Sequence, residues 1–129
     1  LYSSAASDVY KRQGYPLQVQ LEMTPRQAAA ALKREGSGFI LIDCREPFEL
    51  ERARIEGTVD IPMGEVASRL SEIDADEETP IGVICHSGRR SLQVAMYLQE
   101  QGLRGARSVA GGIDLWSVDI DPSVPRYTK

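Results

Sequence analysis

The residues best suited to chemistry form one short segment, Cys85-His86-Ser87-Gly88-Arg89-Arg90, which follows an apolar run and precedes a helical pattern. If this segment curls around its own cysteine at the start of a helix, successive backbone N–H groups point inward and make an anion-binding nest around the sulfur. The helix dipole adds to that field and favours the thiolate of Cys85. Gly88 gives the backbone freedom for a tight curve, and Arg89 and Arg90 add positive charge. The segment therefore predicts a nucleophilic thiolate placed at an anion site.

The same residues also have purely structural interpretations. Cys85 could be an inert buried thiol at the end of a strand. Arg90, in the first turn of a helix, could pair with a carboxylate such as Asp43 or Glu46 while it shapes the loop. His86 could be a general base for Cys85, but neighbours in a tight loop seldom direct their side chains at each other, so we expect it at the pocket mouth.

The two cysteines are too few for a metal centre or for a disulfide-stapled domain. A metal site made of Cys44, Cys85 and His86 would be short of ligands and lacks the paired spacing of zinc sites, so we expect no metal and no other cofactor. Two cysteines in 129 residues instead suit a reducing compartment, and the cytoplasm is the expected location.

Short apolar strands and amphipathic helices alternate around this loop. Thr24-Pro25-Arg26-Gln27 has the cap, proline and returning glutamine of a helix start, and predicts a helix to about Glu35. Phe39-Ile40-Leu41-Ile42 is apolar at every position, as in a strand buried on both faces. The other expected strands cover 59–61, 81–84 and 108–110, and the other expected helical segments cover 47–50, 64–73, 91–102 and 113–116.

This alternation predicts βαβ units, and so an α/β fold with a mostly parallel sheet that helices cover on both faces. Ligands of such sheets lie beyond the carboxyl ends of the strands, where the segments of Asp43 and Cys85 both emerge.

Size and charge narrow the classes of function. The chain is 42% hydrophobic and 26% charged, and its 129 residues suffice for one packed domain. Its formal net charge of −4 and its scattered basic residues give little reason to expect binding to nucleic acid or to an anionic membrane. No apolar run approaches the roughly 18 residues of a membrane-spanning helix. The acidic segment 74–78 is expected to be a solvated connection.

We expect residues 1–16 to be an unstructured or artefactual extension and residues 17–129 to form the domain. The first residues are small and polar and carry no periodicity. Asp8-Val9-Tyr10-Lys11-Arg12-Gln13 resembles the in-frame translation of an adapter used in DNA sequencing.

Four segments resemble, in order, the successive signature segments of the rhodanese superfamily. They are Leu41-Ile42-Asp43-Cys44-Arg45-Glu46, Ile55-Glu56-Gly57-Thr58-Val59-Asp60-Ile61-Pro62, the loop from Cys85 to Arg90, and Gly111-Gly112-Ile113-Asp114-Leu115-Trp116. The resemblance covers roughly residues 21–127, and four ordered motifs are far more specific than one. It implies a single-domain sulfurtransferase with a rhodanese-like, five-stranded, mostly parallel sheet flanked by helices.

The resemblance also implies a role for each site residue. Cys85 would accept a sulfane sulfur as a persulfide, and Asp43 and Arg45 would support the loop. The substrate-binding residues would be His86, Ser87, Gly88, Arg89 and Arg90. The sulfur would come from thiosulfate or a persulfide, on a small molecule or a protein, and would pass to a thiol or to cyanide. Arg54 and Glu56 stand where many members have histidine and proline, which should alter a surface turn only.

Cys44 stands where the family often has an apolar residue. The family topology places its strand beside the one that ends in Cys85, and neighbouring strands lie about 4.8 Å apart, so the two sulfurs could come within disulfide reach. Cys44 is therefore either a small filler that points away from the pocket or a second thiol able to bridge to Cys85.

Two other classes of function fit the loop. A cysteine phosphatase or arsenate reductase would use it to hold phosphate or arsenate. However, four residues separate Cys85 from Arg90, whereas the phosphatase pattern has five, and the shorter loop favours sulfur. A non-catalytic rhodanese-like module would instead bind a partner protein, although such modules commonly lack the loop cysteine.

Overall fold

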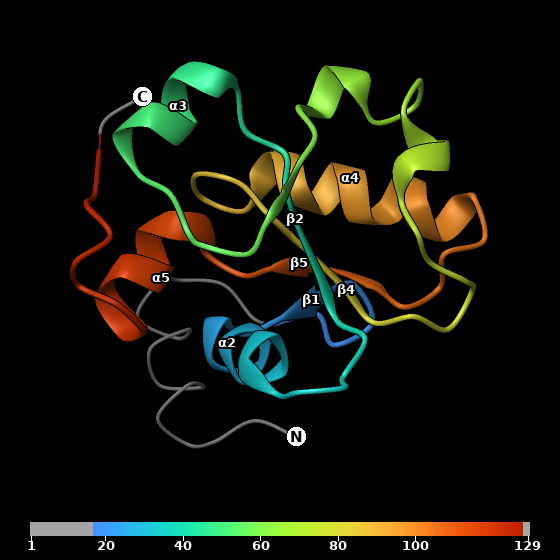
Figure 1. Cartoon of the computed structure of the whole chain (residues 1–129), viewed down its shortest axis with the longest axis horizontal. Helices are drawn as coiled ribbons and strands as arrows, with labels where there is room; N and C mark the ends of the chain where they lie inside the picture. The colour runs from blue at the N-terminus through green and yellow to red at the C-terminus, as the bar shows by residue number, and fades with distance from the viewer. Residues whose placement is uncertain (1–16, 128–129) are drawn as a thin grey trace.

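The computed structural model describes residues 17–127. The extension expected at residues 1–16 lies outside the described residues, as do residues 128–129. The described chain contains a five-stranded sheet in the order β1-β5-β4-β2-β3, and every pair of neighbouring strands is parallel (Figure 1). The predicted α/β class with a parallel sheet is therefore confirmed.

The elements follow one another in the expected alternation. The strands are β1 (Glu22–Met23), β2 (Ile40–Asp43), β3 (Val59–Asp60), β4 (Ile81–Ile84) and β5 (Ala106–Val109). The helices are α2 (Pro25–Lys33), α3 (Pro47–Arg52), α4 (Arg89–Glu100) and α5 (Gly112–Asp119), and two short 3₁₀ turns are η1 (Met63–Glu65) and η2 (Leu70–Glu72). None of the helices within residues 17–127 is long and apolar enough to cross a membrane.

The sheet separates two hydrophobic cores, because neighbouring residues of a strand point to opposite faces. Ile42 and Val83 lie in one core with side chains of α4. Leu41 and Ile84 lie in the other, with side chains of α2 and α5. Figure 1 shows α4 on one side of the sheet and α2 and α5 on the other. The continuous apolar runs of β2 and β4 thus reflect burial on both faces.

The helix predicted after Thr24 begins where the capping pattern placed it. The backbone N–H of Gln27 donates to Thr24 Oγ1 (3.1 Å), and the backbone N–H of Thr24 donates to Gln27 Oε1 (2.9 Å). This reciprocal pair satisfies two donors that a helix start would otherwise leave free.

One expectation about secondary structure was wrong, and one strand was not predicted. The helix expected over 64–73 is replaced by η1 and η2. Val66 and Ile73 are nevertheless buried in the α4-side core, because 3₁₀ turns can bring residues three or four apart to one side as a helix does. Strand β1 was not predicted, since two residues are too few to show a period.

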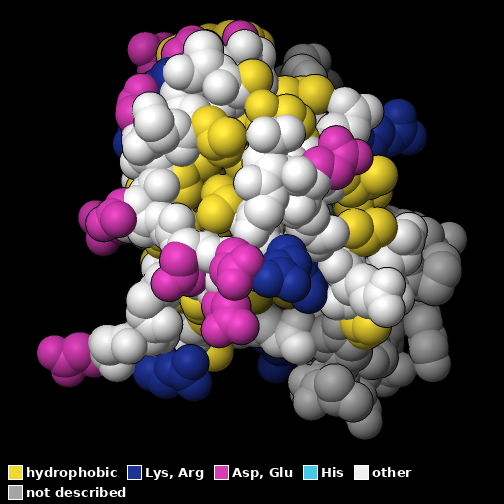
Figure 2. All heavy atoms as spheres, turned by 90° about the vertical axis from the view of Figure 1, so that its right-hand side faces the viewer, with side chains coloured by type: hydrophobic (Ala, Val, Ile, Leu, Met, Phe, Trp, Pro, Cys, Tyr) yellow, Lys and Arg dark blue, Asp and Glu magenta, His cyan; other side chains and the backbone are white. Residues whose placement is uncertain are grey.

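The acidic connection 74–78 is exposed at Asp74, Asp76, Glu77 and Glu78, as expected. Figure 2 shows acidic side chains gathered on the face that forms the right-hand side of Figure 1. Glu77 forms an exposed ion pair with Arg104 (2.6 Å). The loop between β4 and α4 lies towards the other end of the sheet, beside the start of α5 (Figure 1).

Candidate active site

Cys85 follows the last residue of β4, and two backbone amides at the start of α4 face its sulfur. The N–H of Gly88 donates to Cys85 Sγ (3.1 Å), and the N–H of Ser91 donates to the same atom (3.3 Å). Ser91 Oγ lies 3.2 Å from Cys85 Sγ and 2.8 Å from Ser108 Oγ. Gly88 has a φ of 103°, a conformation that side chains rarely adopt, and so allows the chain to turn from strand to helix here.

These hydrogen bonds favour the thiolate. The hydrogen bond from the Cys44 thiol lowers the pKa of Cys85 most; burial acts in the opposite direction; and hydrogen bonds from Ser91 and Gly88 lower the pKa further, to about 5. The same contact with Cys85 raises the pKa of Cys44, which is therefore the protonated partner. Donors that bind only the charged form stabilise it in this way.

The cysteine lies at the wall of an open cavity of about 770 Å³. Cys85 itself is 1% exposed. The cavity is lined by the whole loop from Cys85 to Arg90, together with Glu22 of β1 and Asp114 of α5. His86 therefore lies at the cavity as expected, and its ring stacks on that of Tyr127, with 4.3 Å between ring centroids.

Backbone amides at the start of α5 hold the Cys85 loop in place by hydrogen bonds. The N–H of Ile113 donates to the carbonyl of Cys85 (2.8 Å), and the N–H of Asp114 donates to that of His86 (3.1 Å). A Cβ on Gly112 would lie 2.4 Å from the Cys85 carbonyl oxygen, so only glycine permits this approach. The glycine motif at 111–112 thus has a structural role in the site that the sequence did not reveal by itself.

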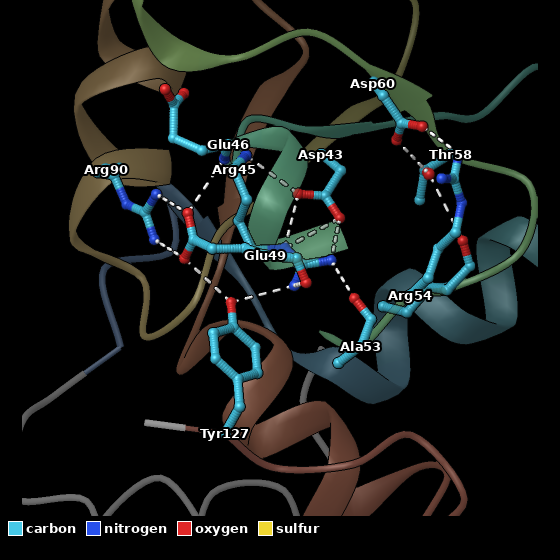
Figure 3. Close-up of polar contacts among 11 residues, drawn as sticks. Asp43, Arg45, Glu46, Glu49, Ala53, Arg54, Thr58, Asp60, Arg90 and Tyr127 are labelled. Atoms are coloured by element: carbon cyan, nitrogen blue, oxygen red, sulfur yellow. Dashed lines mark hydrogen bonds and ion pairs between the residues drawn. The ribbon is translucent and has the colours of Figure 1, made fainter. Parts of the chain in front are cut away.

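Arg90 is paired with Glu49, rather than with Asp43 or Glu46, the carboxylates named from the sequence. Its two terminal nitrogens donate to the two carboxylate oxygens of Glu49 (2.7 and 2.8 Å), as Figure 3 shows. Burial of Glu49 would raise its pKa, but the hydrogen bonds from Arg90, from the Glu46 N–H and from Tyr127 outweigh it and hold the pKa at about 2. The charge of Arg90 is therefore largely balanced.

Asp43 and Arg45 form a buried ion pair. Among the described residues, neither forms a hydrogen bond with the Cys85 loop. Arg45 donates from Nη2 to Asp43 Oδ2 (2.7 Å) and to the carbonyl of Ala53 (2.8 Å). Asp43 is aligned with Ile84 across the sheet, so the two share a face, and the next residue, Cys85, points to the other face. The expected support of the loop is accordingly indirect.

Tyr127 provides the indirect link, and no sequence signal identified it. Its hydroxyl donates to Glu49 Oε1 (3.0 Å) and accepts from Arg45 Nη1 (3.0 Å). Its ring lies against His86. The C-terminal segment thus joins Arg45 and Glu49 in the network drawn in Figure 3 and contacts the loop through the stacking on His86.

Cys44 lies on the same side of the sheet as Cys85. Both cysteines belong to the α4-side core, and both are free thiols. Cys44 is not among the residues that line the cavity, so both alternatives, a filler that points away from the pocket and a second thiol beside Cys85, fit this arrangement. The departures at Arg54 and Glu56 fall at the surface: Arg54 pairs with Asp60 across an exposed turn (Figure 3), and Glu56 is exposed.

Comparison with known proteins identifies the family. A family model of the rhodanese-like domain matches residues 24–119. The chain is 33% identical over 97 residues to the thiosulfate sulfurtransferase GlpE of Pseudomonas syringae, covering 75% of this chain and 88% of that protein. It is 38% identical over 89 residues to the chloroplastic rhodanese-like/PpiC domain-containing protein 12 of Arabidopsis thaliana, covering 67% of this chain and 30% of that protein.

The solved structures agree with the sequence matches. The crystal structure of a rhodanese-related protein from Thermoplasma volcanium has a TM-score of 0.65 and 27% identity, with 81% of this chain and 95% of that chain covered. The chain spans less than half the length of some curated relatives that it matches. On the family model, the sequence matches and the fold together, the chain belongs to the rhodanese family.

Proposed function

We propose that this protein is a sulfurtransferase in which Cys85 takes a sulfane sulfur from thiosulfate or a persulfide and passes it to a thiol or to cyanide. The observation that carries the proposal is the Cys85 sulfur, which accepts hydrogen bonds from the amides of Gly88 and Ser91 and lies at the wall of a cavity. The sulfurtransferase name of the Pseudomonas relative, which the chain covers almost fully, supports it.

The reaction needs two displacement steps. First, the Cys85 thiolate attacks the outer sulfur of the donor; a new S–S bond forms, the donor S–S bond breaks, and sulfite or a thiolate leaves with the electron pair. Second, the acceptor attacks the same outer sulfur, and Cys85 leaves as a thiolate. The kinetics should therefore be ping-pong.

Different residues of the site have different roles in this reaction. The amides of Gly88 and Ser91 stabilise the thiolate that starts the reaction and is regenerated at its end. In other enzymes each such preorganised donor contributes about 2.7–4 kcal/mol to the transition state. Arg89 lines the cavity and is exposed. Because Glu49 balances Arg90, we assign Arg89 the larger part in attracting the donor anion.

Location and partners follow from the same chemistry. Two free thiols in contact persist best in a reducing compartment, which supports a cytoplasmic location. The donor and the acceptor are small molecules or thiols and persulfides carried by other proteins, because the open cavity leaves the reacting sulfur within reach of either kind.

One experiment tests the proposal against the phosphatase alternative. Thiosulfate:cyanide transfer and the hydrolysis of a phosphate ester are measured side by side for the wild type and for Cys85→Ser. We expect sulfur transfer only, and its loss by at least about 10³-fold in Cys85→Ser, with circular dichroism and melting temperature nearly unchanged. Hydrolysis of the ester without sulfur transfer would contradict the proposal.

A further inference from the structure

Cys44 is a buried nucleophile that the two-step reaction does not use. Its N–H donates to the carbonyl of Ile84 (3.0 Å), which continues the pairing of β2 with β4 by one residue beyond Asp43. Cys44 and Cys85 are therefore neighbours across two parallel strands. Aligned residues on such strands lie about 4.8 Å apart, within the range of Cα separations that disulfides span.

The two thiols also point the same way. Ile42 and Val83 are aligned in the sheet and lie in the α4-side core. Cys44 and Cys85 come two residues later on each strand and lie in the same core, as the alternation of side chains requires. The two thiols also influence each other's ionisation: the interaction between them lowers the pKa of Cys85 and raises that of Cys44.

Cys85 lines the cavity, whereas Cys44 does not. Cys85 borders the cavity, where an outer sulfur must sit to reach donor and acceptor. Cys44 is 0% exposed and packed in the core. A thiol that attacks the inner sulfur of a persulfide must approach from the side away from the leaving sulfur, and a position in the core, outside the cavity, is compatible with that approach.

We propose that Cys44 is a resolving thiol, which attacks the Cys85 persulfide and releases its outer sulfur as hydrosulfide. This inference rests on the proposed function, which supplies the persulfide. A bond forms between the Sγ atoms of Cys44 and Cys85, and the bond from Cys85 Sγ to the outer sulfur breaks. The outer sulfur leaves with the electron pair and takes the Cys44 proton, as HS⁻. The two cysteines end as a disulfide, and the sulfane sulfur is reduced by two electrons.

The state of Cys85 controls this reaction. While Cys85 is a free thiolate, its charge and hydrogen bond raise the pKa of Cys44 and keep that thiol protonated. When Cys85 carries sulfur, the negative charge moves to the outer atom in the cavity, and its effect on the pKa of Cys44 becomes weaker. Cys44 has a sulfur to attack only after Cys85 is loaded, and it then competes with the external acceptor for the bound sulfur.

The release can be measured in a single turnover. Wild type, Cys44→Ser, Cys44→Ala and Cys85→Ser are loaded under argon with thiosulfate or, in a parallel arm, glutathione persulfide, and freed of excess donor. Hydrosulfide is then followed by methylene blue formation, and chain mass is followed with and without iodoacetamide. In the wild type we expect one hydrosulfide per loaded chain, and a chain that iodoacetamide no longer modifies until a dithiol is added.

The variants separate this inference from the proposed function. In both Cys44 variants the persulfide should persist at least about tenfold longer, and the two substitutions guard against a folding defect in either one, which circular dichroism checks. If the persulfide lives as long in the wild type as in the Cys44 variants, or if hydrosulfide appears without a disulfide, the resolving role of Cys44 is overturned while the persulfide mechanism stands. If no chain takes up sulfur from either donor, both proposals fall together.

Discussion

Two polar regions meet at the Cys85 loop, and they are built in opposite ways. Around the Cys85 sulfur the donors are neutral: two backbone amides, the Ser91 hydroxyl and the Cys44 thiol. On the other side, Asp43, Arg45, Glu49 and Arg90 form two buried or half-buried ion pairs that share Tyr127.

The contrast shows how one loop can be both reactive and rigid. Neutral donors hold a thiolate without cancelling its charge, so the sulfur stays nucleophilic. The ion pairs balance one another and leave little net charge, so their effect is to fix the loop and the C-terminal segment. Changes in the ion-pair region should therefore alter stability first, and changes around the sulfur should alter activity first.

The strongest way to break the ion-pair region is Arg45→Met. It leaves the carboxylate of Asp43, which is fully buried, without its partner, and breaking a buried pair typically costs about 3–5 kcal/mol. Urea unfolding should report a loss of this size. Arg104→Ala, which removes an exposed ion pair with Glu77, is the control and should leave the unfolding midpoint unchanged. Equal losses in the free energy of unfolding for Arg45→Met and Arg104→Ala would contradict the claim that the buried ion-pair region stabilises the protein.

Ser91→Ala probes the sulfur side. Removing the hydroxyl takes away one donor to the Cys85 thiolate, so the pKa of Cys85 should rise. Wild-type Cys85 should be alkylated quickly at pH values above its pKa of about 5 and slowly at pH values below it, because the thiolate is the nucleophile. In the variant this transition should move to higher pH, with up to roughly tenfold slower alkylation near pH 5.

The control for this measurement repeats it in the Cys44→Ser background, where Cys85 is the one cysteine that iodoacetamide can modify. The alkylation profiles of Cys44→Ser and of the double variant with Ser91→Ala are then compared. The free energy of unfolding should change less than in Arg45→Met, since a hydrogen bond to a charged group contributes about 1.5–3 kcal/mol, whereas breaking a buried ion pair costs about 3–5 kcal/mol. An unchanged alkylation profile would show that the hydroxyl does not act on the thiolate.

Tyr127→Phe should have the smallest effect of the three. It keeps the stacking on His86 but removes the hydroxyl that joins Glu49 and Arg45, at a cost of about 0.5–1.5 kcal/mol. Tyr127→Ala also removes the ring, and the loop should then be held less firmly. We therefore expect KM for thiosulfate to rise more in Tyr127→Ala than in Tyr127→Phe. Equal KM values would mean that the stacking does not position the loop.

Local sequence patterns predicted most of the fold. The capping residues around Thr24 placed the start of α2, and the apolar runs of β2 and β4 predicted central strands because burial on both faces leaves no room for alternation. The region 64–73 was harder, since the spacing of its buried residues fits a helix and a pair of 3₁₀ turns equally. Strand β1 has too few residues to carry a pattern.

The site was predicted where its residues are contiguous in the chain. The Cys85 loop could be recognised because the nucleophile, the glycine and the helix start follow one another. Glu49 and Tyr127 were missed because their roles depend on contacts with Arg90 and His86, which are far away in the sequence. Single-sequence patterns carry no information about such pairs, and only the packing of α3 and the C-terminal segment brings them together.

The most direct test of the central claim is to locate the transferred sulfur. Because Cys44→Ser cannot resolve the persulfide, the Cys44→Ser protein is incubated with thiosulfate, desalted, alkylated and digested, and the peptides that contain residues 44 and 85 are weighed. A persulfide on Cys85 should add the mass of one sulfur atom to its peptide, cyanide should remove it, and the peptide with residue 44 should gain nothing. A Cys85 peptide without added sulfur would contradict the role assigned to the Cys85 thiolate.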